Sequence, residues 1–140
     1  SMNIHPQSPR YIAHACDAIA SRLPERPLFV YSGNSGVSIA TELARRHLAA
    51  TGREPGMLLV RRASEVARTR SGHQRYDGEG WERVVFADDT VSSGATLRHA
   101  VAAAREALGL DLGAVVEVAT PERVRVMTVR DALRFGLGGE

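Results

Sequence analysis

The sequence predicts one α/β domain across residues 1–140, with a mostly parallel, twisted sheet of about five strands and helices on both faces. Short apolar runs rich in β-branched residues alternate along the chain with longer segments in which apolar residues recur every three or four positions. A chain of 140 residues that is 44% hydrophobic can bury one core of this kind and leaves little room for a second domain.

The first half of the chain is expected to run helix, strand, helix, strand. Pro9, preceded by a serine, is typical of a helix start, and the apolar residues that follow share one helix face. Residues 27–31 are an apolar run bounded by turn residues, which predicts a strand. Helical spacing of apolar residues predicts a helix over 37–50, and the next apolar run predicts a strand over 57–60.

The second half continues this alternation. The expected elements are a strand over 83–87, a helix over 95–108, a strand over 113–118, a fifth strand from Val124 and a short helix from Arg130. Only a few residues separate the last two strands, whereas a parallel return needs about a dozen or more. The fifth strand should therefore pair antiparallel at an edge or lie in another layer.

The strand at 83–87 leads into the most informative segment of the chain. It ends in two adjacent carboxylates, Asp88 and Asp89, which suit vicinal hydroxyls or a hard cation. A loop of small residues then runs into a helix start, which presents backbone N–H groups and the positive end of the helix dipole to an anion. The loop consists of Thr90, Val91, Ser92, Ser93, Gly94, Ala95 and Thr96. One ligand satisfies both halves, a ribose 5-phosphate; the alternative is a buried strand followed by an ordinary capped helix.

This block, RVVFADDTVSSGAT, resembles the 5-phosphoribosyl-1-diphosphate (PRPP) signature of type I phosphoribosyltransferases, and the chain is closest to the orotate phosphoribosyltransferase-like branch. The resemblance implies that Asp88 and Asp89 hold the ribose hydroxyls, either directly or through a Mg²⁺ ion. The two carboxylates would bind this ion themselves or through water. It also implies a set of residues that bind the 5-phosphate: Thr90, Ser92, Ser93, Gly94, Ala95 and Thr96.

Two further segments share this resemblance, and both follow strands, so they should meet the first at one edge of the sheet. The loop after the first strand resembles the pyrophosphate loop of the family: Ser32, Gly33, Asn34, Ser35 and Gly36. Arg61-Arg62 resembles the basic pair before the mobile catalytic loop, so Arg62 would also bind the pyrophosphate. Residues 62–80 are then expected to form a mobile lid, with Arg68, Arg70, His73 and Arg75 as candidates to fold over the ligand. The alternatives are an ordinary strand–helix turn and a solvated surface loop.

The resemblance implies a Mg²⁺-dependent enzyme of nucleotide metabolism that transfers 5-phosphoribosyl from PRPP to a nitrogenous base and releases pyrophosphate. The implied catalytic residues are Asp88, Asp89, Arg62, Arg70 and His73. Ser92 stands where purine-salvage relatives carry an acidic residue, so a pyrimidine-like acceptor is favoured over a 6-oxopurine. The hood over the acceptor is small, about the first 26 residues, and a homodimer is expected. The alternatives are a non-catalytic PRPP- or nucleotide-sensing domain and an α/β domain for another phosphorylated ligand.

Composition excludes several other functions. The 18 basic residues are all arginines, so no P-loop lysine and no Schiff-base lysine exists. The net charge is only +2, and the sequence contains no dense run of basic residues with interleaved aromatics, which argues against nucleic-acid binding. No apolar run approaches the roughly 20 residues of a membrane helix. Ser1 before Met2 looks like an expression remnant, no signal segment is expected, and the lone Cys16 favours the cytoplasm.

Overall fold

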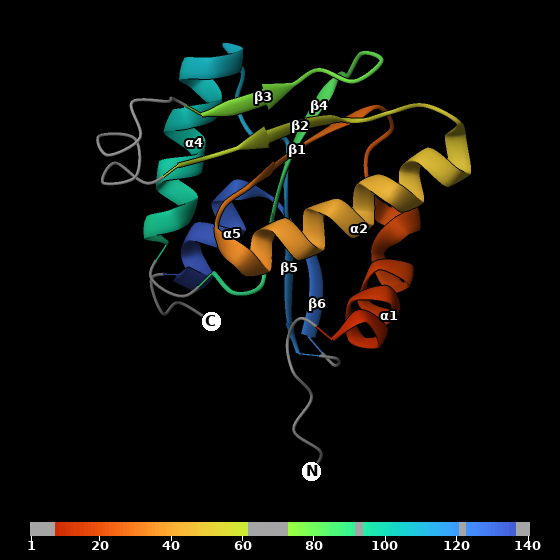
Figure 1. The fold of residues 1–140 in the computed structure, drawn as a ribbon. Coiled ribbons are helices and arrows are strands. Elements are labelled where there is room, and N and C mark those ends of the chain that lie inside the picture. The colour runs from red at the N-terminus through yellow and green to blue at the C-terminus, as the bar shows by residue number, and fades with distance from the viewer. Residues whose placement is uncertain (1–7, 62–72, 92–93, 121–122, 137–140) are drawn as a thin grey trace.

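The computed structural model describes residues 8–61, 73–91, 94–120 and 123–136 and shows an α/β fold built on one six-stranded sheet (Figure 1). The strands are β1 (Pro27–Tyr31), β2 (Gly56–Leu59), β3 (Gln74–Tyr76), β4 (Arg83–Asp88), β5 (Ala114–Thr120) and β6 (Arg123–Met127), in the spatial order β3-β2-β1-β4-β5-β6. The central four strands run parallel, and β3 and β6 pair antiparallel at the two edges. The expected antiparallel edge pairing of the last strand is confirmed.

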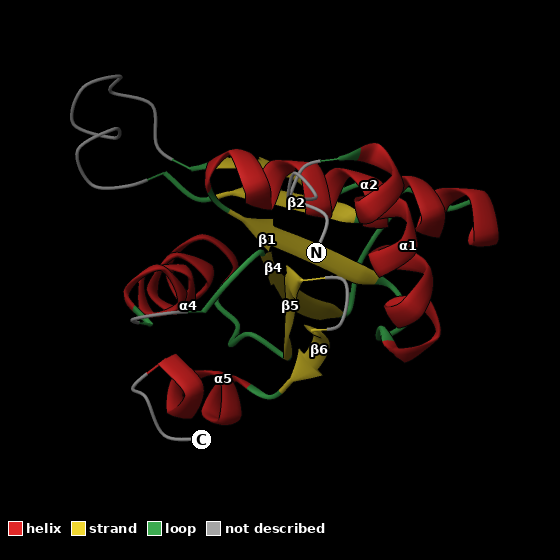
Figure 2. Cartoon of the chain, turned by 90° about the horizontal axis from the view of Figure 1, so that it is seen from below, coloured by secondary structure: helices red, strands yellow, loops and turns green. Residues whose placement is uncertain are grey.

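Helices cover both faces of the sheet, as expected. They are α1 (Pro9–Ile19), followed by the short 3₁₀ turn η1 (Ala20–Arg22), then α2 (Gly33–Thr51), α4 (Ala95–Leu108) and α5 (Val129–Gly136). Figure 2 shows α1 and α2 on one side of the sheet and α4 and α5 on the other. Each pair buries its apolar face against the strands, which gives the fold two core layers.

The strands divide their side chains between these two layers because successive residues of a strand point to opposite faces. Phe29 and Val85 lie in the layer beneath α1 and α2, whereas Leu28 and Val84 lie beneath α4. All four are at most 2% exposed. A parallel sheet covered on both faces needs such continuous apolar strands, and this is why 27–31 and 83–87 were recognisable in the sequence.

The sheet has one strand more than expected. β3 lies within 62–80, the segment predicted to be a lid, and pairs with β2 so that Arg75 is opposite Leu58. Its three residues, Gln74 to Tyr76, are all exposed, so no buried face gave a strand pattern in the sequence. Residues 74–76 of the expected lid therefore form a strand of the sheet, and residues 62–72 lie outside the described residues.

The N-terminal region is part of the layered core. Five residues of α1 are buried: Tyr11, Ile12, Ala15, Cys16 and Ile19. They pack in the same layer as Leu43 of α2, and α1 also contacts β6. The described part of the expected hood thus includes a helix that packs on the sheet, because α1 is amphipathic and buries its apolar face there.

Candidate functional site

The two acidic residues expected from the sequence stand at the carboxyl end of β4. Asp88 is the last residue of the strand and is 8% exposed, whereas Asp89 is half-buried. Asp88 Oδ1 accepts the N–H of Asp89 at 2.8 Å, and Asp89 Oδ1 accepts the N–H of Thr90 at 2.8 Å. Each carboxyl group is thus oriented by the backbone of the next residue.

The surroundings of Asp88 favour its protonated form. Burial, followed by a hydrogen bond with the Asp89 carboxyl group, raises the pKa of Asp88 to about 7, although the N–H of Asp89 opposes the change. The negative charges of Asp89 and Glu117 act in the same direction as burial. The pair therefore gains from any ligand that brings hydroxyl donors or positive charge to this strand end.

The expected phosphate loop leads from Asp89 into α4. Gly94 is the N-cap of this helix with φ +80°, a left-handed conformation that glycine adopts without strain. A small hollow of about 20 Å³ lies here, lined by Phe86, Asp88, Thr90, Val91, Gly94, Thr96 and Leu97. Ser92 and Ser93 lie outside the described residues. A Cβ atom at Gly94 would be 3.3 Å from Nη1 of Arg98, so this guanidinium group, which the sequence did not single out, lies against the loop.

The expected pyrophosphate loop begins a helix rather than forming a separate turn. α2 starts at Gly33, four residues earlier than predicted, with Ser32 as its extended N-cap. Serine and glycine favour helix starts and turns alike, so the sequence left this boundary open. Gly36, in the first turn, lies beside the end of β4: a Cβ atom there would be 3.5 Å from the Ala87 carbonyl and 3.9 Å from Asp88 Oδ1.

The N-termini of α2 and α4 therefore flank the aspartate pair. The N-cap of α4 is a glycine without a side chain, and the side chain of Ser32, the N-cap of α2, makes no capping hydrogen bond. Helix N-termini carry partial positive charge and N–H donors suited to anions. The sheet edge thus combines an acidic centre with a helix N-terminus suited to an anion on either side.

Glu117 is a buried residue of this edge that the sequence interpretation missed. It is 0% exposed on β5, directly opposite Asp88 in the parallel register. Its Oε2 accepts the N–H of Val91 at 2.9 Å, so it connects the start of the expected phosphate loop to the sheet. Its Oε1 accepts Nη2 and Nε of Arg125 at 2.7 and 3.0 Å, and Nε of Arg123 lies 3.3 Å away.

A signal for this network was present in the sequence. Glu117 interrupts the apolar run AVVEVA, and a buried carboxylate needs a cation or several donors. The next strand, RVRVM, alternates arginine with valine, so both arginines share one face. The hairpin register that pairs Glu117 with Arg125 was the missing information.

The expected lid residues have different positions. Arg62, Arg68 and Arg70 lie outside the described residues. Arg75 is on β3, where it donates to Asp77 at 2.8 Å and to the Ala107 carbonyl at 2.6 Å. It also lies 6.0 Å from the centre of the Trp81 ring. The Arg75 side chain thus joins β3 to the end of α4, and its expected contact with a ligand stays a prediction.

His73 and Arg61, the described residues on either side of 62–72, are hydrogen-bonded to each other. Nδ1 of His73 accepts the N–H of Arg61 at 2.9 Å, and the carbonyl of Arg61 accepts Nε2 of His99 at 2.7 Å. The pKa of His73 is lowered, chiefly by burial and then by the charges of His99 and Arg61, while Glu106 opposes this. His73 can therefore donate a proton only through Nε2, and its role as a proton donor stays a prediction.

A cation at this site would take few ligands from the protein. The described residues include no group of three or more His, Cys, Asp or Glu side chains that could hold a metal ion. Mg²⁺ commonly binds one or two carboxylates and completes its shell with water and substrate phosphates. Asp88 and Asp89 would fit that mode, with water and a substrate phosphate as the remaining ligands.

Comparison with known proteins finds no family model that matches the chain and no curated protein that is significantly similar. In the described part of the chain, none of the helices combines the length and the apolar character that crossing a membrane requires.

Proposed function

We propose that this chain is a Mg²⁺-dependent phosphoribosyltransferase that transfers the 5-phosphoribosyl group of PRPP to a nitrogenous base and releases pyrophosphate. One observation carries the proposal: the Asp88-Asp89 pair lies between the N-termini of two helices at the carboxyl edge of a parallel sheet. PRPP has the matching order of groups, with a ribose diol between a phosphate at one end and a diphosphate at the other.

In this assignment each part of the site receives one part of PRPP. The start of α4 receives the 5-phosphate through Thr90, Ser92, Ser93, Gly94, Ala95 and Thr96. The start of α2 receives the diphosphate through Ser32, Gly33, Asn34, Ser35 and Gly36, together with Arg62. Asp88 and Asp89 accept hydrogen bonds from the ribose hydroxyls, or bind Mg²⁺, which offsets the charge of the diphosphate.

The reaction needs positioned charge more than a nucleophilic side chain. The bond between ribose C1 and the diphosphate oxygen breaks while the base nitrogen forms a bond to C1. Positive charge develops on the ribose and negative charge on the leaving diphosphate. The aspartate pair lies where the ribose charge grows, and the N–H groups of α2 lie where the leaving charge grows. Arg62, Arg70 and His73 are proposed to offset that leaving charge, with His73 as proton donor.

The acceptor and the assembly are further parts of the proposal. A pyrimidine-like base is favoured over a 6-oxopurine because Ser92 replaces an acidic residue. A homodimer is supported by exposed apolar side chains: Leu48 of α2 and Tyr76 of β3, which line one open hollow, are 41% and 53% exposed, and Val37 of α2 is 40% exposed. Light scattering should therefore give twice the chain mass of 15.1 kDa; the mass of a single chain would reject the dimer.

The proposal is tested by incubating the protein with PRPP, Mg²⁺ and a panel of pyrimidine and purine bases while pyrophosphate is measured. PRPP affinity is determined in parallel by calorimetry. Release that depends on one base supports the enzyme. Binding of PRPP without release for any base favours the sensing domain, which shares the site geometry. Absence of PRPP binding rejects both.

A further inference from the structure

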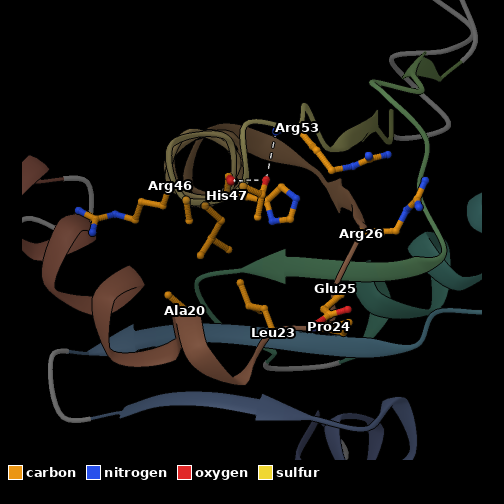
Figure 3. Close-up of a pocket in the computed structure, with 11 residues that line it drawn as sticks. Ala20, Leu23, Pro24, Glu25, Arg26, Arg46, His47 and Arg53 are labelled. Carbon is orange, nitrogen blue, oxygen red and sulfur yellow. Dashed lines mark hydrogen bonds between the residues drawn. The ribbon is translucent and has the colours of Figure 1, made fainter.

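A second pocket, of about 360 Å³, lies at the opposite end of α2 (Figure 3). It is formed between the connection from α1 to β1, the last turns of α2 and the connection from α2 to β2. Its lining consists of Ala20, Leu23, Pro24, Glu25, Arg26, Leu43, Arg46, His47, Ala50, Thr51 and Arg53. The 19 residues of α2 span about 28 Å, so this pocket is well separated from the site at the start of the helix.

The pocket has an apolar floor and a cationic rim. Leu23 and Leu43 belong to the floor, whereas three arginines and a histidine contribute the basic groups and Glu25 is the one carboxylate of the lining. Figure 3 shows His47 between Arg46 on one side and Arg26 and Arg53 on the other. The charge of Arg46 is offset within the fold, because it pairs with Asp17 and lies 3.8 Å from Glu42.

Arg26 and Arg53 are less completely paired, and both contact one turn. Arg53 Nη2 donates to the neutral carbonyl of Glu79 at 2.9 Å. A Cβ atom at the next residue, Gly80, would lie 3.1 Å from Arg26 Nη2. Arg26 Nε is buried without a hydrogen-bond partner among the described residues, and the carboxylate of Glu82 is 3.7 Å away. Two guanidinium groups thus meet at one side of the pocket.

The backbone of Arg26 gives an independent indication of function. Its φ of +50° is the one positive value at a non-glycine residue in the described part of the chain. A left-handed conformation is unfavourable for a residue with a Cβ atom, and such strain is often found at binding sites. The surrounding chain maintains it, since the Arg26 carbonyl accepts the N–H groups of Glu82 and Arg83 at 2.7 and 3.3 Å. Glycine would fit this position more easily, but only arginine brings a cation to the rim.

We propose that this pocket binds a nucleoside monophosphate, a phosphomonoester whose base is a flat body with apolar faces. The phosphate lies between Arg26 and Arg53, because guanidinium groups each direct two N–H donors at phosphate oxygens. The flat body lies on Leu23 and Leu43 beside the His47 ring. Burial and the charge of Arg53 lower the pKa of His47, so its ring is neutral at neutral pH. A volume of about 360 Å³ is at the lower end of the range for small-ligand sites.

The test uses AMP and UMP as a purine and a pyrimidine probe, titrated calorimetrically into four proteins. These are the wild type, Arg26→Gln with Arg53→Gln, Asp88→Asn with Asp89→Asn, and Arg45→Gln. Arg45 is an exposed arginine of the same helix that is outside the pocket lining, so it is the matched control. We expect at least one nucleotide to bind the wild type and Arg45→Gln equally, and the first double variant about tenfold more weakly. In the Asp88 and Asp89 variant, in which the proposed PRPP site is altered, the binding that depends on Arg26 and Arg53 should persist.

Three results would overturn the proposal. The first is no binding of either nucleotide to the wild type at millimolar concentration. The second is loss of binding in the Asp88 and Asp89 variant rather than in the Arg26 and Arg53 variant. The third is inorganic phosphate binding as tightly as the nucleotides, which would leave the apolar floor without a role.

Arg26→Gly separates binding from folding. Glycine relieves the positive φ, so this variant should retain the wild-type thermal midpoint or exceed it and still bind the nucleotide more weakly. Wild-type affinity in Arg26→Gly would mean that the guanidinium group has no role and would overturn the proposal. Nuclear magnetic resonance locates the ligand: the imidazole signals of His47 should shift with nucleotide, while those of His14, an exposed residue of α1 outside the pocket lining, should not.

Discussion

The two ends of α2 lie beside candidate sites of opposite charge, one acidic and one basic. At its start, the carboxylates of Asp88 and Asp89 lie between two helix N-termini, and burial together with the acidic neighbours raises the pKa of Asp88 to about 7. At its end, incompletely paired guanidinium groups surround an apolar floor. The first site is therefore suited to hydroxyl donors or cations at its centre and anions at its sides, whereas the second is suited to one anionic group.

The sites also differ in how the chain assembles them. Most of the first comes from one continuous segment, 88–96, which a motif describes. The second is collected from short segments around residues 20–26, 43–53 and 79–80. A continuous site can be recognised in a sequence, whereas a site assembled from distant segments requires the fold. The following predictions test this contrast.

The largest effect should come from the titration of Asp88. Its pKa is raised from 3.8 to about 7, so between these values the folded protein binds more protons than the unfolded chain. Its contribution to stability is complete below pH 3.8 and is lost as the pH rises through about 7. At about 1.4 kcal/mol per pH unit, the upper limit of this loss is about 4 kcal/mol.

Asp88→Asn removes this titration. Urea unfolding in EDTA at pH 4 to 8 should show the variant gaining stability relative to the wild type as the pH rises. A difference between the two proteins that does not change with pH would show that Asp88 has an ordinary pKa.

Glu117→Ala should destabilise the protein by about 3 kcal/mol, because it leaves Arg125 without its carboxylate and the N–H of Val91 without an acceptor. Replacing both Glu117 and Arg125 by leucine should recover much of this loss. The control is Asp111→Ala, which breaks the exposed pair with Arg105 and should cost less than about 1 kcal/mol. Equal losses in the two alanine variants, measured by urea unfolding, would show that Glu117 is not a structural support of the loop.

Asp88→Asn with Asp89→Asn should weaken PRPP binding in the presence of Mg²⁺ by at least about tenfold, or about 1.4 kcal/mol. Both carboxylates stand at the proposed ribose position, and the amide groups lose the negative charge that a diol or a cation requires. Calorimetry measures the affinity, and circular dichroism confirms that the variant is folded. Unchanged affinity in a folded variant would remove the proposed ribose site.

Arg26→Gly should have the smallest effect on folding. Because glycine adopts a φ of +50° without strain, the free energy of unfolding should rise by up to about 1 kcal/mol. The greater freedom of glycine in the unfolded chain reduces this gain. Arg45→Gly is the matched change in the interior of α2 and should instead cost about 1 kcal/mol. Thermal unfolding of both variants measures the contrast. A clear loss of stability in Arg26→Gly would show that the arginine side chain supports the fold.

Several elements followed directly from local patterns in the sequence. The helix over 95–108 has its predicted bounds, since apolar residues recur at helical spacing and Gly109 adopts the left-handed conformation that ends it. The strand over 27–31 was also predicted with its correct bounds, because a strand buried on both faces must be continuously apolar. The adjacency of Asp88 and Asp89 at a strand end is likewise a property of the chain sequence.

Other features depend on contacts between distant residues. β3 has no buried face, so its three residues carry no strand pattern, and its pairing with β2 defines it. The Glu117–Arg125 pair depends on the register of a hairpin, and Arg26 meets Arg53 only where the turn near Gly80 approaches both. The spacing of apolar residues shows which side of a helix or strand is buried, so the buried side can be predicted from neighbouring residues in the sequence. The register of strand pairs, and the contacts between charged side chains of separate segments, depend on how the whole sheet packs. No local sequence pattern contains this information.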